Sequence, residues 1–381
     1  MRRSTDRILT THTGSLPRSE ELVDLLFARE AGQPVDSEVL ADQVRRDVAE
    51  LVRKQTRVGV DVISDGEASK TAFVRYVKER LGGFSGASAT PSYADQDEFP
   101  AFAQARAIGG ATRRMPPNPA CEGPVTVRDR EAVQRDIANL RMALGEHEPG
   151  DCFLPAASPG VIAMNLDNHY YPTHEAYIYA VADAMRQEYE AITGAGFLLQ
   201  LDCPDLAMGR HRHFKDQSTE EFRRHSTLSI EALNHAVAGI PPSQLRLHVC
   251  WGNYEGPHTR DIELHDILDI VLQANVEAIS IEAANPRHEH EWHLFRGFDF
   301  PEDKILIPGV IDSTTNFVEH PELVAERIVR IAQLIGRERV VAGTDCGFST
   351  AAGWGNVAPD IVWAKLASLV EGARLASLEL W

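Results

Sequence analysis

The stretch Gln244-Leu245-Arg246-Leu247-His248-Val249-Cys250 has the pattern of a short buried strand that ends in two side chains able to bind a metal. Residues i and i+2 of a strand project to the same side, so His248 and Cys250 can face one ion. A helix is predicted after this strand, near residues 259–274. This strand–helix unit is the pattern that the rest of the chain repeats.

Seven further units of the same kind are predicted along the chain. The eight strands are expected at 8–11, 60–64, 152–155, 197–202, 244–248, 278–282, 304–308 and 339–343, and the principal helices at 20–30, 37–58, 173–193, 219–238, 259–274, 290–296, 321–336 and 359–378. Strands that alternate with helices indicate a parallel sheet, and eight such units predict an α/β fold of the (β/α)₈ (TIM) barrel type. In that fold the active site lies at the C-terminal ends of the strands.

One segment, at about 84–150, breaks this rhythm. It is rich in proline, glycine and charged residues. A structureless loop of this length is improbable inside a compact domain. We therefore expect an inserted excursion of short strands and one helix between strands two and three, within a single barrel domain that spans residues 1–381.

Composition and charge limit the classes of partner. The formal net charge of -18 disfavours nucleic acid and anionic membranes, because phosphate groups would be repelled. No apolar run approaches the roughly 20 residues of a membrane span, and the N-terminal residues lack the apolar core of a signal peptide. We expect a cytoplasmic protein that acts on small molecules, and the sequence leaves the oligomeric state open, a homo-oligomer included. The five cysteines are odd in number and widely scattered, which is typical of reduced thiols.

A metal site is predicted where three strands end. Glu282 ends the strand at 278–282, and Cys346 follows the strand at 339–343, so both can join His248 and Cys250 at the same end of a barrel. One imidazole, two thiolates and one carboxylate suit zinc. The alternative is that the cysteines are ordinary buried thiols and His248 a hydrogen-bonded core histidine. The shared position at the ends of strands five, six and eight favours the metal.

Other polar residues at strand ends are candidates for binding substrate. Asp202 can bind an ammonium group, or it can cap a helix. Backbone amides near Ser15 can hold a carboxylate and Glu67 can pair with an amine, although both also suit simple turns. Candidates for acid–base work are Asp205, His169 and His12. A further tract, at His288, His290 and His293, is expected to start a surface helix.

The motifs Thr13-Gly14-Ser15-Leu16-Pro17-Arg18, Asp65-Gly66-Glu67, His248-x-Cys250, Pro308-Gly309-Val310-Ile311-Asp312 and Asp345-Cys346-Gly347 make the chain resemble the catalytic C-terminal barrel of cobalamin-independent methionine synthase. The resemblance is stronger to the stand-alone single-barrel branch of that family, and the chain is also similar to epoxyalkane:coenzyme M transferases. It implies zinc on His248, Cys250, Glu282 and Cys346. It also implies that Ser15, Glu67 and Asp202 grip the carboxylate and amine of the acceptor. Thr314 stands where the family enzyme carries a histidine implicated as proton donor.

These observations predict a zinc-dependent methyltransferase or alkyltransferase that acts on a thiol. Two thiolates and one carboxylate bring about three negative charges to a doubly charged ion, which keeps a bound sulfur electron-rich and favours thiol alkylation over water activation. The leading expectation is methyl transfer to a homocysteine-like small-molecule thiol from a methyl donor that the sequence does not identify. The alternatives are alkyl transfer to a thiol such as coenzyme M, and a non-catalytic barrel with structural zinc.

Overall fold

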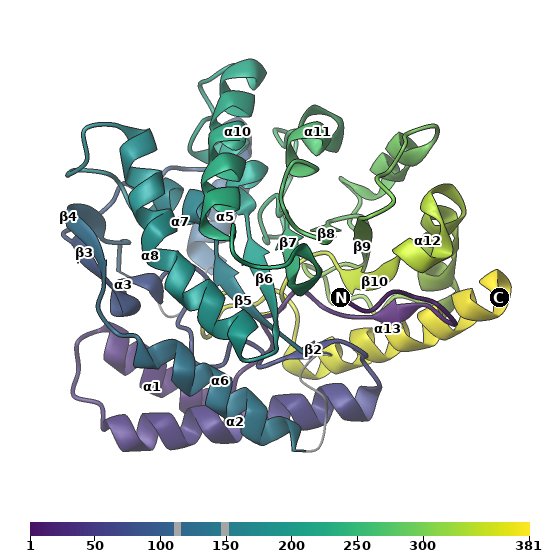
Figure 1. Ribbon diagram of the computed structural model, residues 1–381, viewed down its shortest axis with the longest axis horizontal. Coiled ribbons are helices and arrows are strands. Elements are labelled where there is room, and N and C mark those ends of the chain that lie inside the picture. The colour runs from purple at the N-terminus through teal and green to yellow at the C-terminus, as the bar shows by residue number, and fades with distance from the viewer. Residues whose placement is uncertain (110–115, 146–151) are drawn as a thin grey trace.

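The barrel strands form one parallel sheet in this computed structural model, which describes residues 1–109, 116–145 and 152–381. The strand order is β1-β10-β9-β8-β7-β6-β5-β2 (Figure 1). The bounds are β1 Leu9–Thr10, β2 Ile63–Ser64, β5 Cys152–Ala157, β6 Leu198–Asp202, β7 Leu245–His248, β8 Ala278–Ile281, β9 Ile305–Ile311 and β10 Val341–Thr344. Neighbouring strands follow one another in the chain, except where β10 meets β1 and where the excursion separates β2 from β5. The predicted (β/α)₈ barrel with an insertion between its second and third strands is confirmed.

The first and second barrel strands close the sheet. Thr11 and Val62 form a parallel bridge beyond the ends of β1 and β2, and the Val62 amide donates to the Thr10 carbonyl at 3.0 Å. Inside the barrel, the Arg246 guanidinium donates to Thr11 Oγ1 at 2.9 Å and stacks over the ring of Phe153. The interior is therefore filled by side chains and is not a pore.

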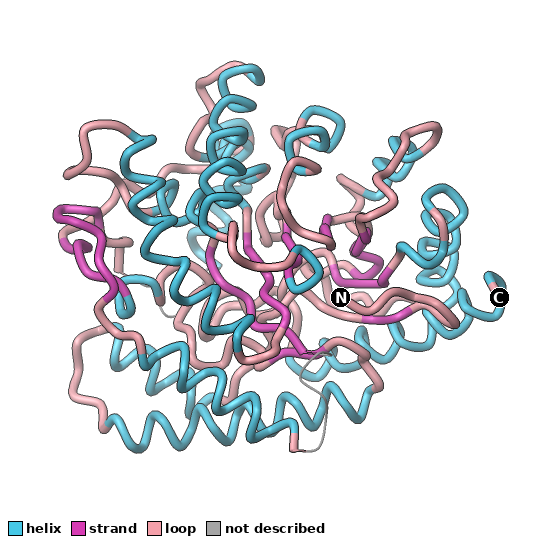
Figure 2. Tube along the Cα trace, viewed as in Figure 1, coloured by secondary structure: helices cyan, strands magenta, loops and turns pink. Residues whose placement is uncertain are grey.

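Long amphipathic helices surround the strands, as Figure 2 shows in cyan around magenta. Their bounds are α1 Glu20–Glu30, α2 Ser37–Val58, α8 His174–Gly194, α10 Thr219–Ala236, α12 Pro321–Ile335 and α13 Pro359–Leu380. In α2 the Asp36 side chain caps the first turn, Gly59 ends the helix at φ 94°, and a buried stripe that includes Val44, Val48 and Leu51 faces the barrel. Among the described residues, no helix is long and apolar enough to cross a membrane.

The helices of two units differ from the sequence prediction: the one after β7 is shorter, and the one after β8 has the predicted length but is a 3-10 helix. After β7 the chain forms only the 3-10 helix η4 (Leu264–Asp266) and α11 (Leu268–Val271), and after β8 only the 3-10 helix η5 (Glu289–Phe295). These segments are held by buried side chains instead: the Leu264 amide donates to Glu291 Oε1 at 2.6 Å. His290 and His293 are exposed as expected, but His288 is buried, with its ring nitrogens 2.9 Å from Asp261 and Glu291. The prediction of a surface tract is wrong for His288, because two carboxylates offer its ring partners inside the protein.

The excursion contains more structure than one helix. It begins with α3 (Val77–Arg80) and contains the antiparallel strands β3 (Leu81–Ser85) and β4 (Ala120–Val127) together with α4 (Ala94–Glu98), α5 (Pro100–Gly109) and α6 (Glu131–Leu144). Helix α6 packs against α2 and α8 on the outside of the barrel. The predicted span of about 84–150 includes residues 110–115 and 146–150, which lie outside the described part of the chain.

Candidate metal and substrate site

A cavity of about 390 Å³ lies at the C-terminal ends of the strands. Its wall includes His248, Cys250 and Cys346, and also Ser15, Glu67 and Asp202. The excursion adds residues such as Tyr93, and the chain after β6 adds Arg212. The cavity therefore brings three of the four predicted metal ligands and the predicted substrate-binding residues to one space, while Glu282 is not part of its wall.

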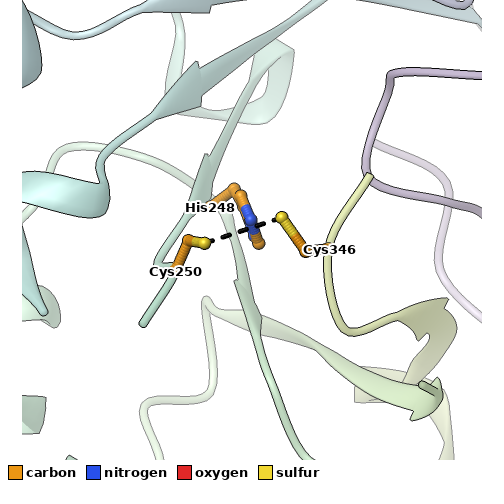
Figure 3. Close-up of side chains that lie close together, drawn as sticks. All are labelled: His248, Cys250 and Cys346. Atoms are coloured by element: carbon orange, nitrogen blue, oxygen red, sulfur yellow. Dashed lines mark hydrogen bonds between the residues drawn. The ribbon is translucent and has the colours of Figure 1, made fainter. Parts of the chain in front are cut away.

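Three side chains in this cavity are placed to share an ion. His248 ends β7, Cys250 follows two residues later, and Cys346 follows β10; one ligand atom from each lies within 4.8 Å of the others (Figure 3). The two Sγ atoms are 3.5 Å apart. Both ring nitrogens of His248 are buried, and neither has a hydrogen-bond partner among the described residues. A buried imidazole without a partner is costly, and a metal ion supplies the missing partner, so these residues fit a zinc site.

The electrostatics of the three residues suit a metal cation. Burial, with the nearby Arg246 charge, lowers the pKa of His248 to about 3, so the imidazole is neutral at pH 7, the form that binds metals. A hydrogen bond with Cys346, together with burial, raises the pKa of Cys250 well above its usual value. The pKa of Cys346 is raised as well: its hydrogen bond with Cys250 lowers it, but burial and the Glu282 charge outweigh this effect. Both cysteines therefore hold their protons in the metal-free protein, and metal binding must release them.

Glu282 lies beside this group but outside it. Its Oε1 accepts a hydrogen bond from the Trp251 amide at 2.8 Å, and its Oε2 accepts one from Asn285 Nδ2 at 2.9 Å. Burial, with the adjacent Cys250, raises the pKa of Glu282 well above its usual value. The Glu282 carboxylate is therefore close enough to Cys250 to interact with it electrostatically. It is nevertheless not a member of the group within 4.8 Å, which consists of His248, Cys250 and Cys346.

Asp345 fixes the loop that carries Glu282. Its Oδ1 accepts the amides of Ala283 and Ala284, each at 2.8 Å, and its Oδ2 accepts the Asn285 amide at 2.8 Å. Because Asp345 directly precedes Cys346, the loops after β8 and β10 are tied together behind the candidate metal site.

Two buried carboxylates make the other half of the cavity acidic. Glu67 has a buried Oε2 without a hydrogen-bond partner among the described residues, and its backbone adopts φ 57°. Asp202 ends β6, and its Oδ1 accepts from Gln200 Nε2 at 2.8 Å. Burial raises the pKa of both carboxyls, and the Glu67 charge helps to bring that of Asp202 to about 8. A cation placed between them would be strongly favoured.

Ser15 lies against the loop that carries Cys346. Its Oγ accepts the Ser349 amide at 3.3 Å, its carbonyl accepts the Phe348 amide at 2.9 Å, and a Cβ added at Gly347 would overlap its Oγ. Arg18, three residues later, donates to the carbonyls of Ala68 and Lys70 and so holds the loop that carries Glu67. This guanidinium is occupied by the backbone and lies outside the cavity wall.

The three predicted acid–base candidates do not line the cavity. His12 is buried with Nε2 2.7 Å from Gln55 Oε1 and Nδ1 accepting the Gly14 amide, and burial lowers its pKa to about 4. Asp205 is buried against Ser158, whose Oγ donates to it at 3.1 Å, and burial raises its pKa to about 6. His169 is exposed. None of these positions brings a proton to the cavity directly.

Several residues of the cavity wall carried no signal in the sequence. Tyr93 comes from the excursion, Arg212 ends the short helix α9 (Met208–Arg212) and His213 follows it, and Asn253 and Trp354 come from long loops. Loops have no hydrophobic period that would reveal which side chains face a cavity. Of these residues, only Asn253 sits close enough in sequence to a predicted ligand, Cys250, for its place to be guessed.

Residues 8–114 and 170–373 match the profile of the family described as cobalamin-independent synthase, catalytic domain. A methionine synthase from Saccharolobus islandicus is 25% identical over 374 residues, covering 97% of this chain and 95% of that protein. One from Thermococcus kodakarensis is 26% identical over 381 residues, with 97% and 94% covered.

Solved structures of similar fold cover the whole barrel. A B12-independent methionine synthase from Shewanella sp., in complex with selenomethionine, superposes with a TM-score of 0.73 at 20% identity, covering 98% of this chain and 99% of that one. A putative vitamin-B12 independent methionine synthase from Listeria monocytogenes gives a TM-score of 0.65 at 18% identity, with the same coverage. The profile match spans more than half of the chain and confirms the resemblance seen in the sequence motifs. The chain therefore belongs to the cobalamin-independent synthase catalytic-domain family and is an enzyme of the methyltransferase type.

Proposed function

We propose that this enzyme transfers a methyl group to the thiol of a homocysteine-like amino acid in a zinc-dependent reaction. The observation that carries the proposal is the single cavity whose wall holds both His248, Cys250 and Cys346 and the carboxylates Glu67 and Asp202. The first group suits a metal that binds sulfur, and the second suits an ammonium group. An amino acid with a side-chain thiol presents both groups in one small molecule.

The acceptor would be held by its amine and carboxylate. Glu67 Oε2 and the Asp202 carboxylate are buried and their pKa values are raised by burial, so an ammonium group placed between them would favour the charged form of both. Ser15, at the end of the cavity nearest Cys346, offers its hydroxyl to the carboxylate. Glycine at position 347 leaves the space that this hydroxyl occupies.

Zinc would be held by His248, Cys250 and Cys346, and the adjacent Glu282 carboxylate would be available as a fourth ligand. Bound zinc lowers the pKa of a thiol, which is about 8.5 when free, so that the acceptor is a nucleophilic thiolate at neutral pH. The side chains of the protein would place the acceptor. Glu67 and Asp202 would fix its amino-acid end, and the buried position of Cys250 and Cys346 would keep water away from the acceptor sulfur bound between them.

The methyl donor would bind against other residues of the cavity wall, among them Tyr93, Met208 and Trp354. Thr314 has no role in proton transfer in this proposal. Its Oγ1 donates to Asp312 Oδ1 at 2.8 Å and it does not line the cavity. A hydroxyl is in any case too weak an acid to replace an imidazole at neutral pH.

A thiol that carries a sulfonate, such as coenzyme M, is the second candidate acceptor. Arg212 favours it, because this guanidinium lines the cavity and makes no ion pair with any residue in the described ranges; its Nε donates to the Pro91 carbonyl at 3.4 Å. The transferred carbon would then come from an epoxide or another alkyl donor.

The test measures zinc and then asks which thiol reaches it. The protein is purified without chelators, its zinc content is determined, and homocysteine and coenzyme M are added while the zinc X-ray absorption edge is recorded. The proposal expects about one zinc per chain and a new zinc–sulfur signal with homocysteine. Asp202→Ala should abolish that signal at the same homocysteine concentration, and Arg212→Ala should leave it unchanged.

Other outcomes reject the proposal in distinct ways. A signal with coenzyme M alone, lost in Arg212→Ala, would establish the second candidate. Bound zinc that responds to no thiol would indicate a structural metal in a non-catalytic barrel. Absence of zinc from the purified protein would remove the basis of the proposed chemistry.

A further inference from the structure

Asn253 lines the cavity, and neither acceptor binding nor metal ligation accounts for it. It lies three residues after Cys250 in the loop that follows β7. Its Nδ2 donates to the Gly347 carbonyl at 2.6 Å, and its Oδ1 accepts from Ser313 Oγ at 3.0 Å. Both ends of the amide are therefore used, and each reaches a different loop.

The first of these hydrogen bonds joins the loops that carry the two thiols. Gly347 directly follows Cys346, so the bond from Asn253 links a position three residues from one thiol to a position one residue from the other. On its opposite side, the same loop rests on Ser15 through the Phe348 amide at 2.9 Å. The chain around Cys346 is thus held from two directions, by β1's loop and by β7's loop.

The first hydrogen bond fixes the orientation of the amide, and the second completes it. The Gly347 carbonyl can only accept, so Nδ2 must face it, and Oδ1 is left facing the buried Ser313, whose hydroxyl can donate to it. The loop after β9 therefore holds the other end of the Asn253 side chain.

We propose that Asn253 is a positioning residue that holds the loops of Cys250 and Cys346 at the separation at which both thiolates bind one metal ion. This inference rests on the metal site of the proposed function.

Two physical reasons support this role. Two thiolates that share an ion repel each other, and a loop after a strand end has no ladder hydrogen bonds to resist that repulsion. A side-chain amide bridging the two loops keeps the ligands near their bound positions before the ion arrives, which reduces the ordering that binding must impose. Hydrogen-bond partners of metal-site residues typically change metal affinity by 10–100-fold when they are removed.

The test compares zinc affinities of four variants with the wild type, by competition against a chromophoric chelator. Asn253→Ala removes both bonds and should raise the zinc dissociation constant about 10–100-fold. Asn253→Asp keeps the acceptor for Ser313 but places a carboxylate against the Gly347 carbonyl. Its zinc affinity should therefore be no higher than that of Asn253→Ala. Ser313→Ala keeps the bond to Gly347 and should weaken zinc binding by less than about tenfold, since the Asn253 side chain loses only one of its two bonds.

Asn316→Ala is the matched control. Asn316 lies in the same loop as Ser313, and its side chain also bridges two loops, donating to the Asn356 carbonyl at 3.2 Å and accepting the Ala358 amide at 2.8 Å. It does not line the cavity. This variant should bind zinc like the wild type, even if its melting temperature falls.

Melting temperatures of the metal-free variants separate positioning from simple stability. The inference requires that Asn253→Ala lose zinc affinity at a temperature where it is fully folded. Zinc affinity of Asn253→Ala within twofold of the wild type would overturn it, as would an equal loss in Asn316→Ala. If Asn253→Ala does not fold, Ser313→Ala decides by the same criterion. A wild type that binds no zinc would instead overturn the proposed function, so the two failures are distinguishable.

Discussion

Replacement of Gly347 by alanine tests the close contact that joins the candidate metal loop to the candidate carboxylate grip. An added Cβ would overlap Ser15 Oγ and would lie 3.2 Å from Ser15 Cβ. The hydroxyl would have to move by roughly 1.5 Å to regain an ordinary contact of about 3.5 Å. Overpacking of this kind costs about 1–3 kcal/mol, and the lower entropy of the unfolded alanine chain offsets about 0.4–1 kcal/mol. We therefore expect Gly347→Ala to lose about 1–2 kcal/mol of stability.

The assay is thermal unfolding of the metal-free protein. At about 2.1 cal/mol/K of unfolding entropy per residue, a chain of this length loses roughly 1–3 °C in melting temperature for that change. Ser15→Gly in the same chain removes the overlapping atoms, so the double variant should recover most of the loss relative to Ser15→Gly alone. Gly239→Ala is the control, because a Cβ there meets nothing within 4 Å.

Additivity would refute this reasoning. If the double variant equals the sum of the two single changes within about 0.5 kcal/mol, Gly347 and Ser15 are not in the contact described. An unchanged melting temperature in Gly347→Ala would have the same meaning.

Three further predictions concern charge, metal and packing. Burial and the Glu67 charge raise the Asp202 pKa from 3.8 to about 8, so ionised Asp202 destabilises the fold increasingly as the pH rises between these values. The melting temperature of metal-free Asp202→Asn should therefore exceed that of the wild type at pH 8 and equal it at pH 4. A difference in melting temperature that does not depend on pH would contradict this. Zinc at 100 times its dissociation constant should add about 2.7 kcal/mol to the free energy of unfolding, which raises the melting temperature by roughly 3 °C. His248→Ala should abolish that rise. A rise that persists in this variant would mean that zinc binds at another site. A Cβ at Gly160 would overlap the Asp205 carboxylate and lie 2.7 Å from Ser229 Oγ, so Gly160→Ala should lose about 1–3 kcal/mol of stability in denaturant unfolding. Because Asp205 lies outside the cavity, the KM for the thiol should not change. A large rise in that KM would show that Asp205 affects thiol binding.

The barrel and the direction of its active end were predictable from the sequence alone. Apolar runs such as Ile305–Ile311 are buried on both faces, as is typical of a parallel strand covered by helices, and their alternation with helices pointed to that arrangement. The period-2 geometry of β7 places His248 and Cys250 on one side, and the alternation of strands and helices forces all strand ends to one face. Those local rules sufficed to expect the candidate ligands and the carboxylates together.

Only the tertiary structure decided which of these side chains lie close enough together to bind one ion. Glu282 and Cys346 both follow strand ends, yet Cys346 Sγ lies 3.5 Å from Cys250 Sγ inside the three-residue group, while the Glu282 carboxylate, which accepts from Trp251 and Asn285, lies outside that group. His12 and Asp205 look reactive in sequence, but Gln55 and Ser158 occupy them inside the protein. The hydrogen-bond partners of buried polar groups come from distant parts of the chain and are set by packing, so no pattern of nearby residues encodes them. The wall contributed by Tyr93, Arg212 and Asn253 has the same origin: loops take their positions from the barrel ends on which they rest.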